Sequence, residues 1–394
     1  MRARFVTSSL LAAVLTAGCT TSSTTAAQAA PVDQGPRNAP HLTPAFDAQT
    51  RAPEAITYEN LTVQTLATGL ERPWGLDVLP DGRMLVTERP GRLWLLSADG
   101  SSRSEIGGVP SVAASGQGGL LDVAVSPTFA SDAHVFLTYA KPGSTPGTAS
   151  TAVARAVLQD GALTGVTDLL IQSPATSATV HYGSRLAFAP DGDLFVTFGD
   201  RGNPPRAQDP SDLAGKVVRL DPGGPPVADA ASVIWSTGHR NVQSAAVRPS
   251  SGALWTVEHG PRGGDELNRP DAGGNHGWPD VSYGINYNGT PVGSGEASAT
   301  GIVEPRYFWD PVIAPSGMAF YQGDLFGAWQ DSVLIGSLNP GGLVRLRLDG
   351  DEVVGEEHFR VGVERVRDVH VTTDGRVLIL VDASDGAIRE LTPP

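Results

Sequence analysis

The chain has few of the features that stabilise small or helical proteins. Its 394 residues include one cysteine, Cys19, which excludes an intramolecular disulfide, so the fold must be stabilised by burial. Long helical periodicity is absent, while 47 glycines and 31 prolines favour many turns and short strands. The net charge of −14 excludes a nucleic-acid partner, because no basic stripe is present to displace counterions. An all-β protein is therefore expected.

The first 19 residues predict export. Arg2 and Arg4 precede a short apolar run over residues 6–15, and small residues at 16–18 lead directly to Cys19. This pattern is typical of a lipoprotein signal peptide and predicts a periplasmic or cell-envelope protein tethered by lipid at Cys19. An ordinary cleaved signal with an incidental cysteine is the alternative. Residues 20–55 are rich in Ser, Thr, Ala and Pro and are expected to form a flexible tether, and residues 56–394 are expected to form one domain.

One unit recurs through residues 56–394. A turn rich in Pro, Asp or Gly is followed by a short apolar strand, as in Pro80-Asp81-Gly82 before residues 84–87. Similar turns precede residues 135–138, 194–197, 254–257, 333–336 and 377–380. Six units of roughly 55 residues each match the blades of a propeller. We predict one six-bladed β-propeller, rather than an array of β-sandwiches, with its ligand site on the axis.

Five polar loops beside these strands are candidates for one shared site. They carry Gln117, His181, the pair Arg240 and Asn241, the acidic run 258–268, and the pair Arg365 and Arg367. Alone, each has an ordinary explanation, because polar loop residues commonly cap turns or face solvent. Together, several arginines, an amide and an imidazole describe a receptor for a small molecule with several negative charges, since arginine binds carboxylates in a planar, bidentate manner.

The most unusual of these loops is Glu258-His259-Gly260-Pro261-Arg262-Gly263-Gly264-Asp265-Glu266-Leu267-Asn268. It contains three carboxylates and three glycines, and it follows the strand-like residues 253–257. Glycines let the backbone approach a ligand closely, and carbonyl oxygens beside carboxylates are the donors that calcium prefers. A turn-rich surface loop is the alternative.

Together with Gly274-Asn275-His276-Gly277-Trp278-Pro279 and Ser282-Tyr283-Gly284-Ile285-Asn286-Tyr287, this run resembles the PQQ-dependent aldose sugar dehydrogenases, relatives of soluble quinoprotein glucose dehydrogenase. The resemblance extends from Leu61 to the C-terminus. It implies a six-bladed propeller that holds pyrroloquinoline quinone (PQQ) and calcium and oxidises aldoses at C1 to lactones by hydride transfer to PQQ. An external quinone or redox protein would take the electrons, because the chain has no Cys-x-x-Cys-His haem motif.

The resemblance also implies roles for individual residues. His181 matches the catalytic base, and the cofactor contacts match Gln117, Arg240, Asn241, Arg365 and Arg367. The carbonyls of Gly260 and Pro261 match ligands of the cofactor's calcium, whereas Glu266, His276 (through its carbonyl) and Tyr287 match a second, structural calcium site. Trp74, Trp309 and Tyr307 are candidates for stacking on the sugar, with ordinary packing as the alternative.

Two positions depart from the family pattern. Val180 stands where the soluble glucose enzyme has an acidic residue before its catalytic histidine, so the orientation of His181 must come from elsewhere. Asn339 stands where a lysine contacts PQQ. Two other functions stay open: a calcium-dependent propeller lactonase or hydrolase without a quinone, and a non-catalytic propeller that binds carbohydrate or a protein.

Overall fold

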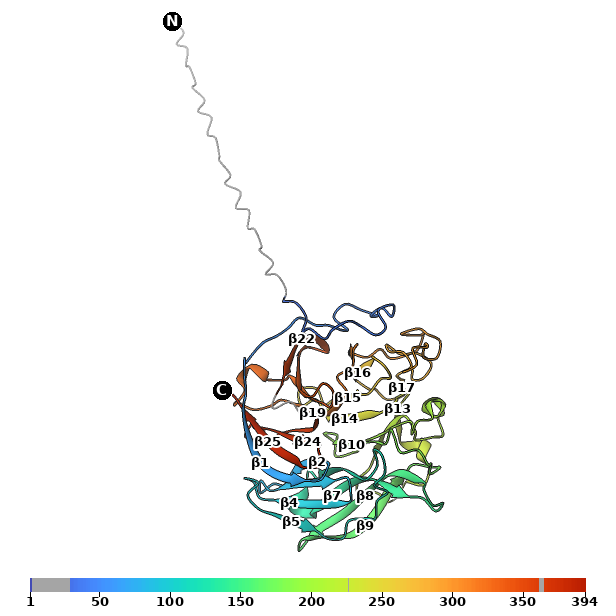
Figure 1. Cartoon of the computed structure of the whole chain (residues 1–394), viewed down its shortest axis with the longest axis vertical. Coiled ribbons are helices and arrows are strands. Elements are labelled where there is room, and N and C mark those ends of the chain that lie inside the picture. The colour runs from blue at the N-terminus through green and yellow to red at the C-terminus, as the bar shows by residue number, and fades with distance from the viewer. Residues whose placement is uncertain (2–28, 226, 361–364) are drawn as a thin grey trace.

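The structure is a computed structural model that describes residue 1 and residues 29–225, 227–360 and 365–394. Its described residues form six sheets around a central axis (Figure 1). Five sheets have four antiparallel strands, and the sixth has four antiparallel strands and a short fifth strand that pairs parallel. The innermost strands of neighbouring sheets contact one another in a closed ring, in which the last returns to the first. The predicted six-bladed β-propeller is therefore confirmed.

Each sheet runs from an innermost strand at the axis to an outer strand at the rim. The innermost strands are β2 (Pro73–Val78), β6 (Leu120–Val125), β10 (Gly183–Phe188), β14 (Val242–Val247), β19 (Pro315–Phe320) and β23 (Val366–Val371). The second strands are β3 (Met84–Glu88), β7 (His134–Pro142), β11 (Leu194–Phe198), β15 (Leu254–Glu258), β20 (Val333–Ser337) and β24 (Val377–Val381). The third strands are β4 (Arg92–Leu96), β8 (Ala149–Gln159), β12 (Lys216–Leu220), β16 (Asp265–Asn268), β21 (Gly342–Asp349) and β25 (Gly386–Thr392). The outer strands are β5 (Arg103–Ile106), β9 (Ala162–Ile171), β13 (Ile234–Thr237) with the added β17 (Gly274–Asn275), β18 (Tyr307–Trp309), β22 (Glu352–Phe359) and β1 (Thr62–Leu70). Short helical elements are α1 (Phe129–Asp132), η1 (Pro204–Gln208), η2 (Ala230–Val233) and η3 (Gly327–Trp329).

The ring is closed by strands from both ends of the chain. β1 pairs antiparallel with β25, from Thr62 opposite Thr392 to Leu70 opposite Gly386. The blue β1 and the red β25 lie side by side in Figure 1. Pairing in this blade therefore fixes the first strand of the domain to the last, and leaves no open edge between first and last blades.

The recurring turn and strand of the sequence are the link between each innermost strand and its second strand. All six predicted strand segments fall in second strands, and every residue of β3, β11, β15, β20 and β24 is buried. In the first turn, Gly82 has a φ of +87° and Asp81 Oδ1 accepts the N–H of Arg83 at 3.1 Å. A strand buried on both faces is largely apolar, which explains the apolar runs, and polar exceptions such as Thr87 are hydrogen-bonded, here to the carbonyl of Leu121.

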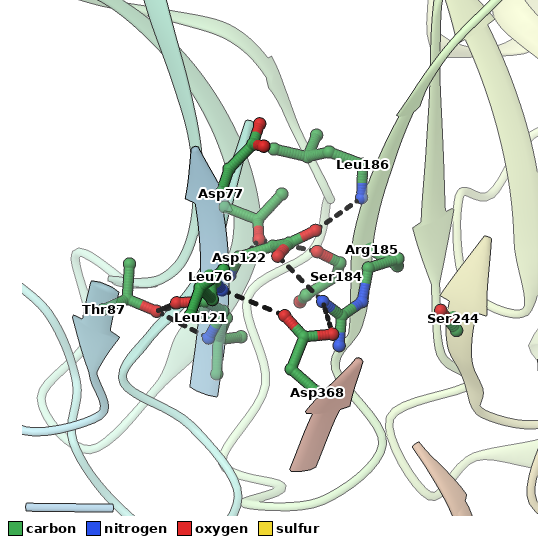
Figure 2. Close-up of polar contacts among 12 residues, drawn as sticks. Leu76, Asp77, Thr87, Leu121, Asp122, Ser184, Arg185, Leu186, Ser244 and Asp368 are labelled. Atoms are coloured by element: carbon green, nitrogen blue, oxygen red, sulfur yellow. Dashed lines mark hydrogen bonds and ion pairs between the residues drawn. The ribbon is translucent and has the colours of Figure 1, made fainter. Parts of the chain in front are cut away.

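Charged and polar side chains of the innermost strands fill the axis. Arg185, from the third position of β10, donates through Nη1 to Asp122 at 3.0 Å and to Asp368 at 2.9 Å (Figure 2). Each carboxylate also accepts a backbone N–H from the following blade, that of Leu186 for Asp122 and that of Leu76 for Asp368. Burial raises the pKa of Asp122 to about 7, and Arg185 opposes this shift. These bonds fix the blades relative to one another.

Residues 29–55 correct the expectation of a flexible tether. Ala39, Leu42 and Ala52 are buried, and the backbone of Ala55 bonds Glu356 of β22 at 2.9 Å. Figure 1 shows this blue segment running across one side of the disc, past β22 toward β16. The predicted signal with Cys19, and residues 20–28 of the predicted tether, lie outside the described residues. Among the residues that are described, no helix is long and apolar enough to cross a bilayer.

Candidate active site

A cavity of about 190 Å³ opens at the end of the axis where the innermost strands begin. All six innermost strands run in the same direction, so the residues at their starts converge there. The predicted residues Gln117, Asn241, Arg365 and Arg367 line this cavity. The structure therefore brings together side chains that lie up to 250 positions apart in the sequence, from Gln117 to Arg367.

The cavity wall carries a large excess of positive charge. Four of its lining residues are arginines, Arg72, Arg89, Arg365 and Arg367, and its one carboxylate belongs to Asp382. Asp382 Oδ2 pairs with Arg367 at 2.8 Å and with Arg365 at 3.3 Å. Four arginines against one carboxylate leave three positive charges uncompensated among these lining residues. Such a wall suits a small ligand with several carboxylates.

Arg72 and Arg89 were missed by the sequence reasoning, and neither side chain pairs with a carboxylate in the described part of the chain. Arg89 Nη1 donates to the carbonyl of Gly116 at 2.7 Å, and its buried Nε has no partner there. Burial lowers the pKa of Arg89, the nearby charge of Asp382 opposes this shift, and the charges of Arg72 and Arg365 add to it. Arg72 is exposed and Arg89 is partly buried, and an anion between such crowded positive charges would stabilise both, so this wall suits an anionic ligand.

His181 lies beside this cavity in a strained backbone conformation, with a φ of +53°. Its N–H donates to Gln117 Oε1 at 2.8 Å, and its Nδ1 lies 2.7 Å from Asp200 Oδ1. Arg201 donates to the carbonyls of Ala178 and Val180 and so fixes the backbone leading to His181. The imidazole is held on one edge and keeps Nε2 free of any bond within the described residues.

Asp200 supplies the carboxylate partner that Val180, the residue before His181, cannot provide. No carboxylate precedes His181 in the sequence, and the one that orients it comes from the end of β11. Asp200 is fully buried, and its Oδ2 accepts the indole N–H of Trp278 at 2.9 Å. An ionised carboxylate is an acceptor only, so Nδ1 of His181 carries the proton and Nε2 is the basic nitrogen.

The acidic loop leaves the end of β15 on the same side of the propeller. Glu258 accepts from Asn268 Nδ2 at 3.0 Å and from the N–H of Arg240 at 2.7 Å, and lies 2.8 Å from His239 Nδ1. Asp265 accepts three backbone N–H groups, those of Gly260, Ile313 and Ala314. Asp265 therefore fixes the loop backbone at Gly260, and Glu258 ties the start of the loop to Asn268 and to residues 239–240. These two carboxylates are not free to be the main ligands of a metal.

A second, smaller hollow of about 20 Å³ lies against this loop, large enough for a water or one ion. Its lining includes four of the five predicted metal residues: Gly260, Pro261, Glu266 and His276. Arg240 and His259 also line it, and His259 lines the larger cavity too. Burial, reinforced by Glu258, raises the pKa of Glu266 well above its usual range. A buried carboxylate in this situation is stabilised by a cation.

Tyr287, the fifth predicted metal residue, does not line the hollow. It lies at the tip of the turn between Ile285 and Pro291, where its side chain is 73% exposed. Within the described residues, no three or more His, Cys, Asp or Glu side chains are arranged to hold a metal. A cation in the hollow would rely on backbone carbonyls together with Glu266, a donor set that calcium accepts.

The aromatic residues predicted to stack on a sugar have different surroundings. Trp309 and Tyr307 are 0% exposed, and both bond the buried carboxylate of Glu356, so they are packing residues and the stacking prediction is wrong for them. Trp74 does line the cavity, and the guanidinium groups of Arg185 and Arg367 lie 4.4 and 5.9 Å from the centre of its ring. Leu338 lines the wall, immediately before the departing residue Asn339.

Fold and site together define a propeller with a cationic axial cavity and an oriented histidine at its edge. Comparison with known proteins gives the family: the model of the glucose/sorbosone dehydrogenases matches residues 70–390. Aldose sugar dehydrogenase YliI of Escherichia coli is 40% identical over 348 residues, 84% of this chain and 93% of that protein. The chain therefore belongs to the glucose/sorbosone dehydrogenase family, which confirms the predicted resemblance.

Solved structures agree with this assignment. A crystal structure of a glucose dehydrogenase is 44% identical, with a TM-score of 0.79 over 84% of this chain and 99% of that chain. The PQQ-bound form of aldose sugar dehydrogenase from Streptomyces coelicolor is 28% identical, with a TM-score of 0.71 over 84% of this chain and 98% of that chain.

Proposed function

We propose that this protein is an aldose dehydrogenase that oxidises the anomeric C1 of sugars to lactones with PQQ and calcium, and passes the electrons to an external quinone or redox protein. The observation that carries the proposal is the cationic axial cavity beside the His181–Asp200 pair. Family membership and the PQQ-bound structural relative support it.

The cavity residues fit PQQ, a planar molecule with three carboxylates. Its charge matches the three uncompensated positive charges of the wall, and Arg72 and Arg89 have no competing carboxylate in the described residues. Gln117, Asn241, Arg365 and Arg367 would hold it, with Arg240 contributing from the boundary between the cavity and the smaller hollow. Calcium would be held by the carbonyls of Gly260 and Pro261. When bound, PQQ supplies the hydride acceptor and calcium acts as a Lewis acid.

The chain's own residues supply base catalysis and positioning. His181 accepts the proton of the sugar's anomeric hydroxyl at Nε2, because Asp200 engages Nδ1 and holds the ring. Arg240 Nη1 donates to the carbonyl of His259 at 3.2 Å, while its buried Nε has no partner in the described residues. This leaves a positive charge beside the cavity that would stabilise the negative charge developing on the bound quinone.

Reconstitution of the apoprotein tests the proposal. PQQ and calcium should together restore dye reduction with glucose, galactose or arabinose, and His181→Gln should abolish turnover while PQQ still binds, as followed by its absorbance. Absence of reduction with every aldose at full cofactor occupancy would refute the proposal. Metal-dependent ester cleavage without PQQ would instead support the lactonase alternative, and full tolerance of His181→Gln the non-catalytic one.

We also propose that the protein is exported and held at the cell envelope by lipid on Cys19. The signal-like residues 1–19 are the support for this proposal.

A further inference from the structure

The N-terminal strap, defined as residues 31–55, is anchored firmly on the propeller. It loops back on itself, with Pro31 bridged to Pro53. Gln49 is fully buried, its Nε2 donates to the carbonyl of Pro305 at 2.9 Å, and its own carbonyl accepts the N–H of Phe308 at 2.9 Å. The strap begins before the residues matched by the family model, which start at 70.

One buried carboxylate, that of Asp310, receives the strap. It accepts the backbone N–H and the Nδ2 of Asn38, both at 2.8 Å, and the N–H of Ala39 at 2.8 Å. Arg37 Nε lies 3.6 Å away, and Arg51 donates to the carbonyl of Asp310 at 3.0 Å. Asp310 follows β18 directly and has no exposed surface.

The same carboxylate lies against the acidic loop. A Cβ added at Gly263 would lie 2.6 Å from Asp310 Oδ1, and the N–H of Gly264 donates to the carbonyl of Trp309 at 2.9 Å. Asn38 completes the link, because its Oδ1 accepts from Arg262 Nε at 3.1 Å. The side chain of Asn38 therefore bonds Asp310 on one side and the loop on the other.

We infer that the strap is a positioning element for loop 259–264, and that Asn38 transmits its anchoring to the backbone that presents the carbonyls of Gly260 and Pro261. Gly263 and Gly264 have φ values of +83° and +71°. Glycines in such conformations lose much conformational freedom on folding, so a contact from outside the loop lowers the tendency of the loop to open. The consequence for calcium rests on the proposed function, whereas the consequence for loop order does not.

Hydrogen exchange of the full-length apoprotein tests the inference without any cofactor. Asn38→Ala should speed exchange of the amides in residues 259–264 about fivefold, the factor that corresponds to one hydrogen bond of about 1 kcal/mol. Gln34→Ala is the matched control, because it removes a strap bond of similar length to Glu356 of β22, away from the loop. Arg262→Ala removes the same contact from an exposed side chain and should give the same acceleration, with no further gain in the double variant.

Calcium titration by calorimetry gives a second readout. Asn38→Ala should weaken calcium binding several-fold relative to Gln34→Ala. Loop exchange that is equal in the Asn38 and Gln34 variants overturns the inference. Faster loop exchange without any calcium binding to the wild type would support the strap's positioning role and count against calcium in the proposed function, so the two failures are distinguishable.

Discussion

Substitution of Asp200 by asparagine tests whether a buried carboxylate sets the tautomer of His181. Asp200 uses both oxygens: Oδ1 lies 2.7 Å from His181 Nδ1 and accepts the N–H of Gly202 at 2.7 Å, and Oδ2 accepts Trp278 Nε1 at 2.9 Å. Three donors therefore converge on one carboxylate that is fully buried.

Asparagine has the same shape but one acceptor oxygen, and neither of its two orientations satisfies all three donors. If the oxygen faces His181 and Gly202, the amide N–H₂ meets the indole N–H of Trp278. If it is flipped, the N–H₂ faces the N–H of Gly202, which then has no acceptor. The N–H₂ also donates to His181 Nδ1, so the ring proton moves to Nε2, and Nε2 can no longer accept a proton from substrate. A buried donor without a partner costs about 1–3 kcal/mol. Loss of the productive tautomer lowers kcat by about 10²–10⁴.

Steady-state oxidation of glucose by the PQQ- and calcium-loaded variant, with a dye as acceptor, measures this loss. We expect kcat of Asp200→Asn to fall by at least about 100-fold, with PQQ affinity little changed, because Asp200 does not line the cavity. Asp99→Asn, in an exposed turn where Asp99 bonds Ser97 and Ser101, is the control and should behave as wild type. An unchanged kcat in Asp200→Asn with PQQ fully bound would show that orientation of His181 does not depend on the carboxylate.

Three further predictions concern stability and location. Gly75→Ala should lower the free energy of unfolding by about 1–3 kcal/mol in denaturant titrations, because its Cβ would lie 2.6 Å from Asp122 Oδ1, whereas Gly327→Ala meets nothing within 4 Å and should be neutral. Burial raises the pKa of Asp122 from 3.8 to about 7, so its contribution to stability is present below pH 3.8 and is lost as pH rises through 7. The unfolding free energy of Asp122→Asn, measured relative to that of the wild type, should therefore increase as pH rises from 4 to 8. A difference that stays constant over this range would contradict the raised pKa. Cys19→Ser should move the protein from the membrane fraction to the soluble fraction on cell fractionation, and continued membrane association would contradict a lipid anchor.

Much of the propeller is readable from the sequence because its repeat is local. The turn at Asp81 and Gly82 and the apolar strand after it are set by neighbouring residues, and the same holds for the other five units. Their number gives the blade count, and radial symmetry then places the polar residues at the starts of the innermost strands together. This is why Gln117, Asn241, Arg365 and Arg367 were found, although no contact between them was visible in the sequence.

Three of the residues that the sequence did not predict occupy the same position in their blades, whereas Arg72 lies between β1 and β2. Arg89, Asp200 and Asp382 each follow the end of a second strand: Arg89 and Asp382 come directly after β3 and β24, and Asp200 two residues after β11. Second strands run antiparallel to the innermost ones, so their ends reach the same face as the innermost strands' starts. A charged residue one or two positions after a buried second strand is therefore a signal for this site.

Other differences depend on contacts between distant segments and have no local signal. The strap has few apolar residues, and it is ordered because the carboxylate of Asp310, about 270 positions away, accepts three of its N–H groups. Trp309 and Tyr307 resemble sugar-stacking aromatics in composition, but their burial is decided by the neighbouring blade that supplies Glu356. Pairing across blades is a property of the assembled ring.

The strained backbone of His181 connects the fold to the proposed chemistry. A non-glycine residue at a φ of +53° costs of order 1–3 kcal/mol and persists only where its surroundings determine it. Gln117 from the second blade, Asp200 from the third and the bonds of Arg201 all act on this loop. These blades are themselves joined at the axis by Asp122 and Arg185. The geometry of His181 is therefore preorganised by the propeller as a whole, so that the imidazole of the proposed base would be in place before substrate arrives and less reorganisation would be needed in the reaction.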